Sequence, residues 1–149
     1  MNEFDTPRRT GGYEFVESYD VAASVTIKAG ALVARDGDGN AVPYATTAEG
    51  TVNALVALGR CDATADNSDG AAGDIQVRVR TGVFRWANDV SNKAVTKANI
   101  GAAVYGHDDH TIRSDARTGG NKDNAAKAGR LIAVDDDGAW VATGIPFLW

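Results

Sequence analysis

Apolar and polar residues alternate most regularly near the middle of the chain, over residues 74–80. Ile, Val and Val occupy every second position there, and Gln, Arg and Arg occupy the positions between and after them. Because successive side chains of a strand point to opposite faces, this pattern predicts a strand with one buried face. The alternation resumes over residues 83–86, so Gly82 is expected to mark a bulge or a bend where the strand changes sheet.

One hairpin pattern occurs three times, over residues 30–42, 101–112 and 129–141. Each copy begins with a glycine and an apolar strand, turns at a tip rich in Asp or Gly, and returns through a β-branched residue. Asp and Gly provide the left-handed backbone and the local side-chain hydrogen bonds that tight turns need. The repetition predicts an all-β scaffold that displays surfaces, rather than an enzyme built round one reactive cluster.

Further strands are expected over residues 21–27, 31–34, 41–46 and 52–60. Pro43 predicts an edge position for its strand, because proline cannot donate a hydrogen bond to a neighbouring strand. The segment 52–60 is almost continuously apolar, as in a strand that is buried on both faces.

At most one short helix is expected, over residues 89–99, where Asp89 or Ser91 would cap it. A structured loop is the alternative for this segment. Clusters of Asp, Asn, Ser and Gly predict polar loops over residues 62–73 and 115–127.

The two ends of the chain are rich in aromatic residues. The first twenty residues carry their aromatic side chains among charges and show no clear period. They predict either an extended arm that orders against another surface or a terminal strand that caps the barrel. We divide the chain into an arm over residues 1–20 and a single β domain over residues 21–149. The large apolar residues at the C-terminus are expected to dock in this subunit or in a neighbour.

Length and charge limit the possible partners. The chain has 149 residues, enough for a core without disulfides or metals, and a formal net charge of −5. An acidic chain is a poor match for nucleic acid or an anionic membrane. The sequence shows no signal-peptide pattern and no apolar run that approaches the ~20 residues of a membrane span, so synthesis in a reducing cytoplasm is expected. The single cysteine, Cys61, excludes an intrachain disulfide and is expected to be a free, buried thiol.

The segment from His107 to His110 places two imidazoles and two carboxylates within four residues, as a metal site would need. Adjacent residues of a hairpin tip point in different directions, so turn chemistry is favoured and no metal or cofactor is expected. Residues 36–40 begin like a calcium loop, but Ala41 and Thr47 replace the Gly and Glu that such a loop needs. Both histidines lie on one predicted tip, away from a candidate nucleophile, so we expect no enzymatic activity.

Three arginines offer two interpretations. Arg78 and Arg80 share the outward face of one strand, and Arg85 lies between two aromatic residues. One interpretation is a solvated face with a cation–π contact between Arg85 and Trp86. The other is a binding face for an acidic or carbonyl-rich partner, since Arg and Trp are enriched at interface hot spots. Trp140, on the third hairpin, is expected in the core.

The central and C-terminal parts of the chain, about residues 30–142, resemble the capsid cement proteins of tailed phages, also called head decoration proteins. The resemblance rests on the order of short motifs over residues 58–60, 66–68, 73–74, 82–86, 99–105, 108–112 and 128–141. His110 departs from the pattern, in which a Gln is expected at that position. The resemblance implies a small β-barrel or jelly-roll-like sandwich built from hairpins.

The resemblance also implies a place in the virion. Such a protein is made in the host cytoplasm and binds the outer surface of an assembled icosahedral head. There it bridges neighbouring major capsid proteins as a homodimer or a homotrimer, without nucleic acid or membrane as a partner. The N-terminal arm lies outside the similar region, and in such a protein it would lie across a capsid seam and order on binding.

The expected interface residues are aromatic side chains of the two chain ends and an Arg–Trp pair of the bent strand: Phe4, Tyr13, Phe15, Tyr19, Arg85, Trp86, Phe147 and Trp149. A carbohydrate-binding β-sandwich module is the alternative function, because exposed Trp and Arg side chains of small β-sandwiches often hold sugars. It predicts a monomer that binds a surface glycan and has no affinity for capsids. A metal-dependent hydrolase that uses His107 and His110 is the least favoured interpretation.

Overall fold

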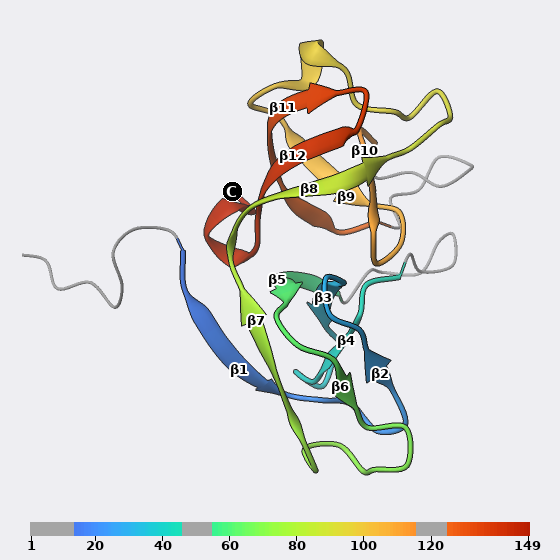
Figure 1. Cartoon of the computed structure of the whole chain (residues 1–149), viewed down its shortest axis with the longest axis vertical. Coiled ribbons are helices and arrows are strands. Elements are labelled where there is room, and N and C mark those ends of the chain that lie inside the picture. Colours follow the sequence, from blue (N-terminus) through green and yellow to red (C-terminus); the bar gives the residue numbers. More distant parts are fainter. Residues whose placement is uncertain (1–13, 46–54, 116–124) are drawn as a thin grey trace, which may run out of the picture.

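A computed structural model describes residues 14–45, 55–115 and 125–149 of the chain (Figure 1). The described residues form twelve β-strands and two three-residue 3-10 turns, which confirms the predicted all-β fold. Neither 3-10 turn has the length or the apolar run that a membrane span needs. The strands build an open sheet, a two-stranded sheet and a closed barrel.

The open sheet has five strands in the order β1-β7-β5-β3-β4, and all neighbours are antiparallel. These strands span Val16–Asp20 (β1), Leu32–Arg35 (β3), Ala41–Pro43 (β4), Val56–Cys61 (β5) and Gln76–Arg80 (β7). The remaining small sheet pairs β2 (Thr26–Ile27) with β6 (Ala65–Asp66). Pro43 lies in the edge strand β4, as its sequence predicts.

The barrel is closed by five strands in the order β10-β8-β12-β11-β9. These strands span Gly82–Asn88 (β8), Ala103–Gly106 (β9), Thr111–Arg113 (β10), Lys127–Asp135 (β11) and Gly138–Thr143 (β12). Neighbours are antiparallel except β8 and β10, which run parallel. Figure 1 shows the barrel above the open sheet, with β7 continuing upward into β8.

A bend at one glycine carries the chain from the sheet into the barrel. β7 ends at Arg80 and β8 begins at Gly82. Gly82 has a φ of 149°, a conformation that side chains rarely adopt and that glycine accepts. The predicted change of sheet at this residue is therefore confirmed.

The three predicted hairpins are the pairs β3–β4, β9–β10 and β11–β12. At each tip the first aspartate accepts a hydrogen bond from the backbone N–H two residues further along. The distances are 2.9 Å at Asp36, 3.0 Å at Asp108 and 2.8 Å at Asp135. The same local side-chain bond thus shapes all three turns, which explains why the pattern is repeated in the sequence.

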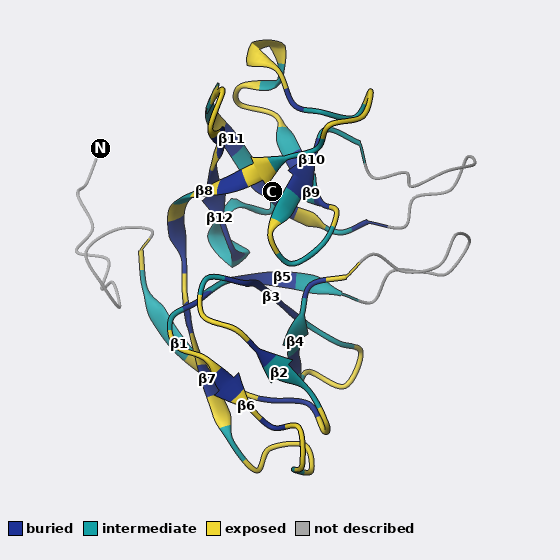
Figure 2. Ribbon diagram, turned by 45° about the vertical axis from the view of Figure 1, so that its right-hand side comes forward, coloured by how far each residue is buried: buried dark blue, intermediate teal, exposed yellow. Residues whose placement is uncertain are grey.

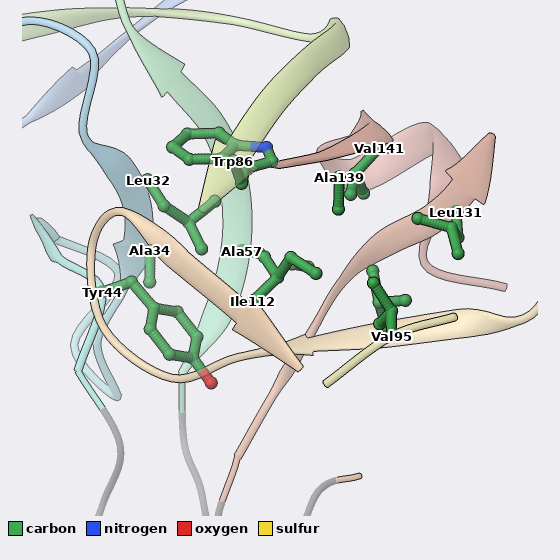
Figure 3. Close-up of a cluster of buried hydrophobic side chains, with 12 residues drawn as sticks. Leu32, Ala34, Tyr44, Ala57, Trp86, Val95, Ile112, Leu131, Ala139 and Val141 are labelled. Carbon is green, nitrogen blue, oxygen red and sulfur yellow. The ribbon is translucent and has the colours of Figure 1, made fainter. Parts of the chain in front are cut away.

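Two clusters of buried apolar side chains hold the fold together. The first lies inside the barrel and extends onto one face of the open sheet (Figure 3), and the second covers the other face. Leu32 belongs to the first cluster and its neighbour Val33 to the second, and Ala57 and Leu58 are divided in the same way. The open sheet is therefore buried on both faces at its centre, as the continuous apolar pattern predicts for the described residues of segment 52–60. A shared core joins the sheet to the barrel.

The predicted helix over residues 89–99 is wrong for most of its length. Only Lys97–Asn99 (η1) is helical, and the rest is the structured loop that was the alternative. The side-chain amide of Asn88 donates to the C=O of Val95 over 2.9 Å and accepts from its N–H over 2.8 Å. This pair of bonds fixes the loop so that Val95 is buried in the first cluster. Val95 therefore reaches the core from a loop and not from a helix.

The predicted boundary between arm and domain at residue 20 also needs correction. Residues 16–20 form β1, which pairs with β7 along its whole length. These residues therefore form a terminal strand and not an extended arm. The strand lies at the edge of the open sheet, whereas the terminal-strand alternative predicted that it would cap the barrel. Its side chains are half-buried or exposed on both faces, so they give only a weak alternating pattern. Phe4 and Tyr13, in the proposed arm, lie outside the described residues.

Candidate partner-binding surface on the barrel wall

The outer wall of the barrel carries three exposed apolar side chains on neighbouring strands: Val83 of β8, Trp140 of β12 and Ile132 of β11. Arg85 shares the outward face of β8 with Val83 and is directly opposite Trp140. We call Val83, Arg85, Ile132 and Trp140 the barrel-wall patch. Figure 2 shows exposed positions along β8, where this wall faces solvent.

A β-bulge accounts for the exposure of Ile132. The pairing of β11 with β12 skips this residue, since Leu131 is opposite Val141 and Ala133 is opposite Trp140. Leu131 is fully buried, whereas Ile132 is 50% exposed. A bulge inserts one residue and re-aims the side chains beside it. The irregularity therefore adds an aliphatic side chain to the wall next to the indole.

The indole of Trp140 is held by one contact over its ring face and by one hydrogen bond from its Nε1–H. The guanidinium carbon of Arg85 lies 5.8 Å from the ring centroid, a cation–π contact. The indole Nε1 donates a 3.4 Å hydrogen bond to Asp135 Oδ2. Asp135 is itself fixed, because its Oδ1 accepts backbone bonds from Asp137 and Gly138 over 2.8 and 3.2 Å. A partner that covers this indole would lose little side-chain entropy, which favours binding.

The burial of the two tryptophans on β8 and β12 is the reverse of what the sequence predicted. Trp86, predicted at an interface, is 4% exposed and lies in the barrel core (Figure 3), whereas Trp140, predicted in the core, is 37% exposed. Arg85 accordingly contacts Trp140 and not Trp86. Adjacent residues of a strand point to opposite faces, so Arg85 and Trp86 could not share one. The alternation of residues 83–86 already indicated that Arg85 and Trp86 lie on opposite faces. The exposure of Trp140 could not be predicted in this way, because it depends on the pairing of β12 with β8.

Arg78 and Arg80 are exposed on one face of β7, as their alternation predicts. Arg80 is bound to Asp62 through Nε and Nη2, over 3.1 and 3.2 Å. The hydrogen bond from Arg80 and the nearby charges of Arg80, Arg78 and Arg60 lower the pKa of the Asp62 carboxyl. The three arginines of the predicted face are divided between two sheets, because Arg85 belongs to the barrel. Of the two arginines on the open sheet, Arg80 therefore already binds an aspartate of its own chain.

The other predicted interface residues lie near the ends of the described chain. Phe15 donates its backbone N–H to Thr81 Oγ1 over 3.1 Å and accepts the Thr81 N–H over 3.0 Å. Tyr19 packs, half-buried, against the second core cluster. Phe147 is half-buried in η2 (Ile145–Phe147), and Trp149 is 81% exposed. Arg85 and Trp149 are thus the exposed members of the predicted set that the structure describes.

The acidic tip of the second hairpin brings three possible metal ligands together. One ligand atom each from Asp108, Asp109 and His110 lies within 4.8 Å of the others, whereas His107 does not belong to this group, so three of the four side chains of the tip converge and not all four. His110 Nδ1 is 2.9 Å from Asp109 Oδ1 and 3.2 Å from Asp108 Oδ1. The hydrogen bond to Asp109, followed by the charge of Asp108, raises the pKa of His110. The imidazole therefore already has partners within the turn.

Cys61 is a free thiol buried in the second core cluster, as predicted. Its Sγ donates to the C=O of Ala63 over 3.1 Å. Burial raises the pKa of the thiol, so it stays protonated at neutral pH and is a poor nucleophile.

Comparisons with models of protein families, with curated proteins and with solved structures found no match for this chain.

Proposed function

We propose that this chain is a structural virion protein that binds the outside of an assembled icosahedral phage head and cements neighbouring major capsid proteins. The barrel-wall patch is the observation that carries the proposal, and the order of motifs that resembles capsid cement proteins supports it. A ligand that binds only the assembled lattice stabilises it by mass action, and many copies multiply a modest affinity. Such a role requires a rigid scaffold and exposed anchors, and it requires no catalytic group.

The composition of the patch suits the centre of an interface. Trp and Arg contribute most to binding energy at such centres, and aliphatic neighbours exclude water around them. Trp140 and Arg85 are opposite one another, with Val83 and Ile132 on the neighbouring positions. The guanidinium of Arg85 has several N–H donors, which would bind carboxylate or carbonyl oxygens of the capsid protein. The outer capsid surface is therefore the proposed location.

Co-sedimentation of the purified chain with expanded, undecorated heads of its own phage tests the proposal. We expect saturable pelleting at a fixed ratio to the major capsid protein. Trp140→Ala and Arg85→Ala should each weaken binding by about thirtyfold or more, as expected for hot-spot residues. Arg78→Ala is the matched control, since this arginine is also exposed on a strand but belongs to the open sheet. Absence of pelleting by a folded chain, or equal loss in all three variants, would contradict the proposal.

A carbohydrate-binding module is the second candidate, and one observation favours it. Trp140 is exposed beside Arg85 and Asp135, and such a combination can stack on a sugar ring and bind its hydroxyl groups. Arg85 lies over the indole ring, however, and competes with a sugar for the stacking surface. Binding of a glycan by the monomer, together with no pelleting on heads, would favour this function over the first.

A further inference from the structure

We propose that the edge of the open sheet formed by β1 pairs with the same edge of a second copy of this chain, antiparallel and centred on Ser18. β1 is one of the two edges of the five-stranded sheet, and β4 is the other. Both Figure 1 and Figure 2 show β1 at the outer margin of the sheet, with β7 on its inner side. The proposal is independent of the proposed function, since association is measured on the isolated chain.

The hydrogen bonds to the β7 segment show which backbone groups of β1 point inward. At the two ends of the strand, Phe15 accepts and Val21 donates a 3.0 Å backbone bond to that segment. Hydrogen-bonded pairs alternate with non-bonded pairs along an antiparallel ladder. Since the register is continuous, Glu17 and Tyr19 also turn their backbone groups towards β7.

Val16, Ser18 and Asp20 therefore turn their N–H and C=O groups away from β7. In the part of the chain that the structure describes, these groups form no backbone hydrogen bond outside the strand ladder. Three donors and three acceptors thus line an edge of five residues. Free groups of this kind are a template for another strand unless the edge is blunted.

The two edges of the sheet differ in this respect. β4 is only three residues long and contains Pro43, and short length and proline both discourage pairing. β1 is five residues long and contains no proline, and it carries two charged residues, Glu17 and Asp20. The edge that is open to pairing is therefore β1.

The sequence of β1 complements itself in one antiparallel register. With Ser18 opposite Ser18 of the second copy, Val16 is opposite Asp20 and Glu17 is opposite Tyr19, so like charges do not face each other. This register overlaps all five residues. The residues whose N–H and C=O groups point away from β7 would form three pairs across the two copies. Each pair would exchange two backbone hydrogen bonds, about six in total. The order of charges in β1 therefore fits a second copy of the same strand.

The arginines of β7 support the same register. Val16 is opposite Arg80 and Ser18 is opposite Arg78 within one chain. In the dimer, Asp20 of the second copy would lie next to Val16, about 10 Å, or two strand spacings, from the backbone of Arg80. Arg80 already binds Asp62, so its attraction to this aspartate offsets only a small part of the repulsion between two chains of net charge −5. The assembly would be a two-fold dimer with one continuous sheet.

Ser18→Pro tests the edge directly. The Ser18 N–H points away from β7, so proline leaves the ladder within the chain intact while it removes a donor and obstructs the second strand. We expect sedimentation velocity to show a monomer–dimer equilibrium for the unaltered chain and for the control Ser18→Ala. Ser18→Pro should shift its midpoint to at least about tenfold higher concentration. Circular dichroism and thermal unfolding check that each variant folds.

A charge exchange at the same residue tests the register. Ser18→Lys places two like charges opposite each other on the two-fold axis and should weaken dimerisation, and Ser18→Glu should do so as well. An equimolar mixture of the two variants should dimerise again, because opposite charges then face each other. Amide exchange should show concentration-dependent protection at Val16, Ser18 and Asp20. The proposal would be overturned if the exchange rates of these three amides did not depend on protein concentration. It would also be overturned if Ser18→Pro dimerised as the unaltered chain does.

Discussion

The indole Nε1 of Trp86 donates a 3.0 Å hydrogen bond to the hydroxyl of Thr143, across the β8–β12 pair in the barrel core. Thr143 in turn donates its hydroxyl proton to the C=O of Val141 over 2.8 Å. Both side chains are buried. One hydroxyl thus accepts from the indole and donates to the backbone, which allows a polar-tipped aromatic residue to lie in an apolar interior.

Replacing Thr143 by valine should destabilise the protein. The change keeps the shape of the side chain and leaves the buried indole N–H without an acceptor, so we expect the free energy of unfolding to fall by about 1–3 kcal/mol. Urea denaturation measures the loss. In a Trp86→Phe background the same change should cost less, because no N–H is left unpaired. Equal losses in the two backgrounds would show that the hydrogen bond is not the cause.

Gly106 leaves the space that the ring of Tyr44 occupies, since a Cβ atom at this glycine would overlap the ring. The ring is fixed because its hydroxyl accepts from the N–H of Ala126 over 2.8 Å and donates to its C=O over 3.1 Å. Gly106→Ala should therefore lower the free energy of unfolding by about 1–3 kcal/mol through overpacking.

Gly39→Ala is the control for this prediction. Gly39 has a φ of 87° and no atom within 4 Å of an added Cβ, so only backbone strain of about 1 kcal/mol is expected. In addition, Gly106→Ala should disturb the near-UV signal of Tyr44 and Gly39→Ala should not. If the two variants changed that signal alike, the close contact between Gly106 and Tyr44 would not explain the loss.

Alkaline pH should destabilise the protein through Tyr44. Burial raises the pKa of its hydroxyl from 10.0 to about 12. The folded state therefore holds this proton more tightly than the unfolded state does. The stabilisation is complete below pH 10 and is lost as the pH rises from about 10 to about 12, by up to about 2–3 kcal/mol.

Tyr44→Phe should remove this part of the pH dependence, as measured by urea unfolding at a series of alkaline pH values. Identical pH profiles for the unaltered chain and Tyr44→Phe would contradict the assignment.

Replacing Arg113 by methionine should stabilise the protein. Arg113 is 3% exposed, and its Nε and Nη2 have no hydrogen-bond partner in the described structure. Burial lowers the pKa of this guanidinium, which shows the cost of keeping the charge there. Methionine has a similar length and no charge, so the free energy of unfolding should rise by about 1–3 kcal/mol.

Arg130→Met is the control, because Arg130 Nη1 donates to the C=O of Gly101 over 3.0 Å and little gain is expected. A loss of stability in Arg113→Met would mean that the guanidinium is stabilising.

Several features could be predicted from the sequence because their causes are local. The hairpin tips follow from side-chain bonds of Asp36, Asp108 and Asp135 to their own turns, and the bend at Gly82 follows from a conformation that glycine permits. The alternation of residues 74–80 identified the exposed face of β7 for the same reason, since neighbouring side chains of a strand must point to opposite faces. The helix over residues 89–99 was not predicted correctly, because the bonds from Asn88 to Val95 override a weak local preference.

The candidate surface was only partly predictable. Arg85 was identified from its place in an alternating strand, whereas the partner assigned to it, Trp86, lies on the opposite face. Ile132 was not identified, because its exposure follows from a bulge that exists only when β11 pairs with β12. Trp140 was assigned to the core, because its hairpin alone does not show which face is covered, and that depends on the pairing of β12 with β8.

The sequence by itself determined the all-β class, the three hairpins and the residue at which the long strand bends, because turns and alternation depend on interactions within a few residues. The tertiary structure decided that five strands close into a barrel, with β8 and β10 parallel although distant in the chain. It also decided which tryptophan is buried and that β1 and β4 are the two edges of the open sheet. These outcomes depend on pairing between segments far apart in sequence, where burial of the shared core selects one arrangement among many that are locally possible.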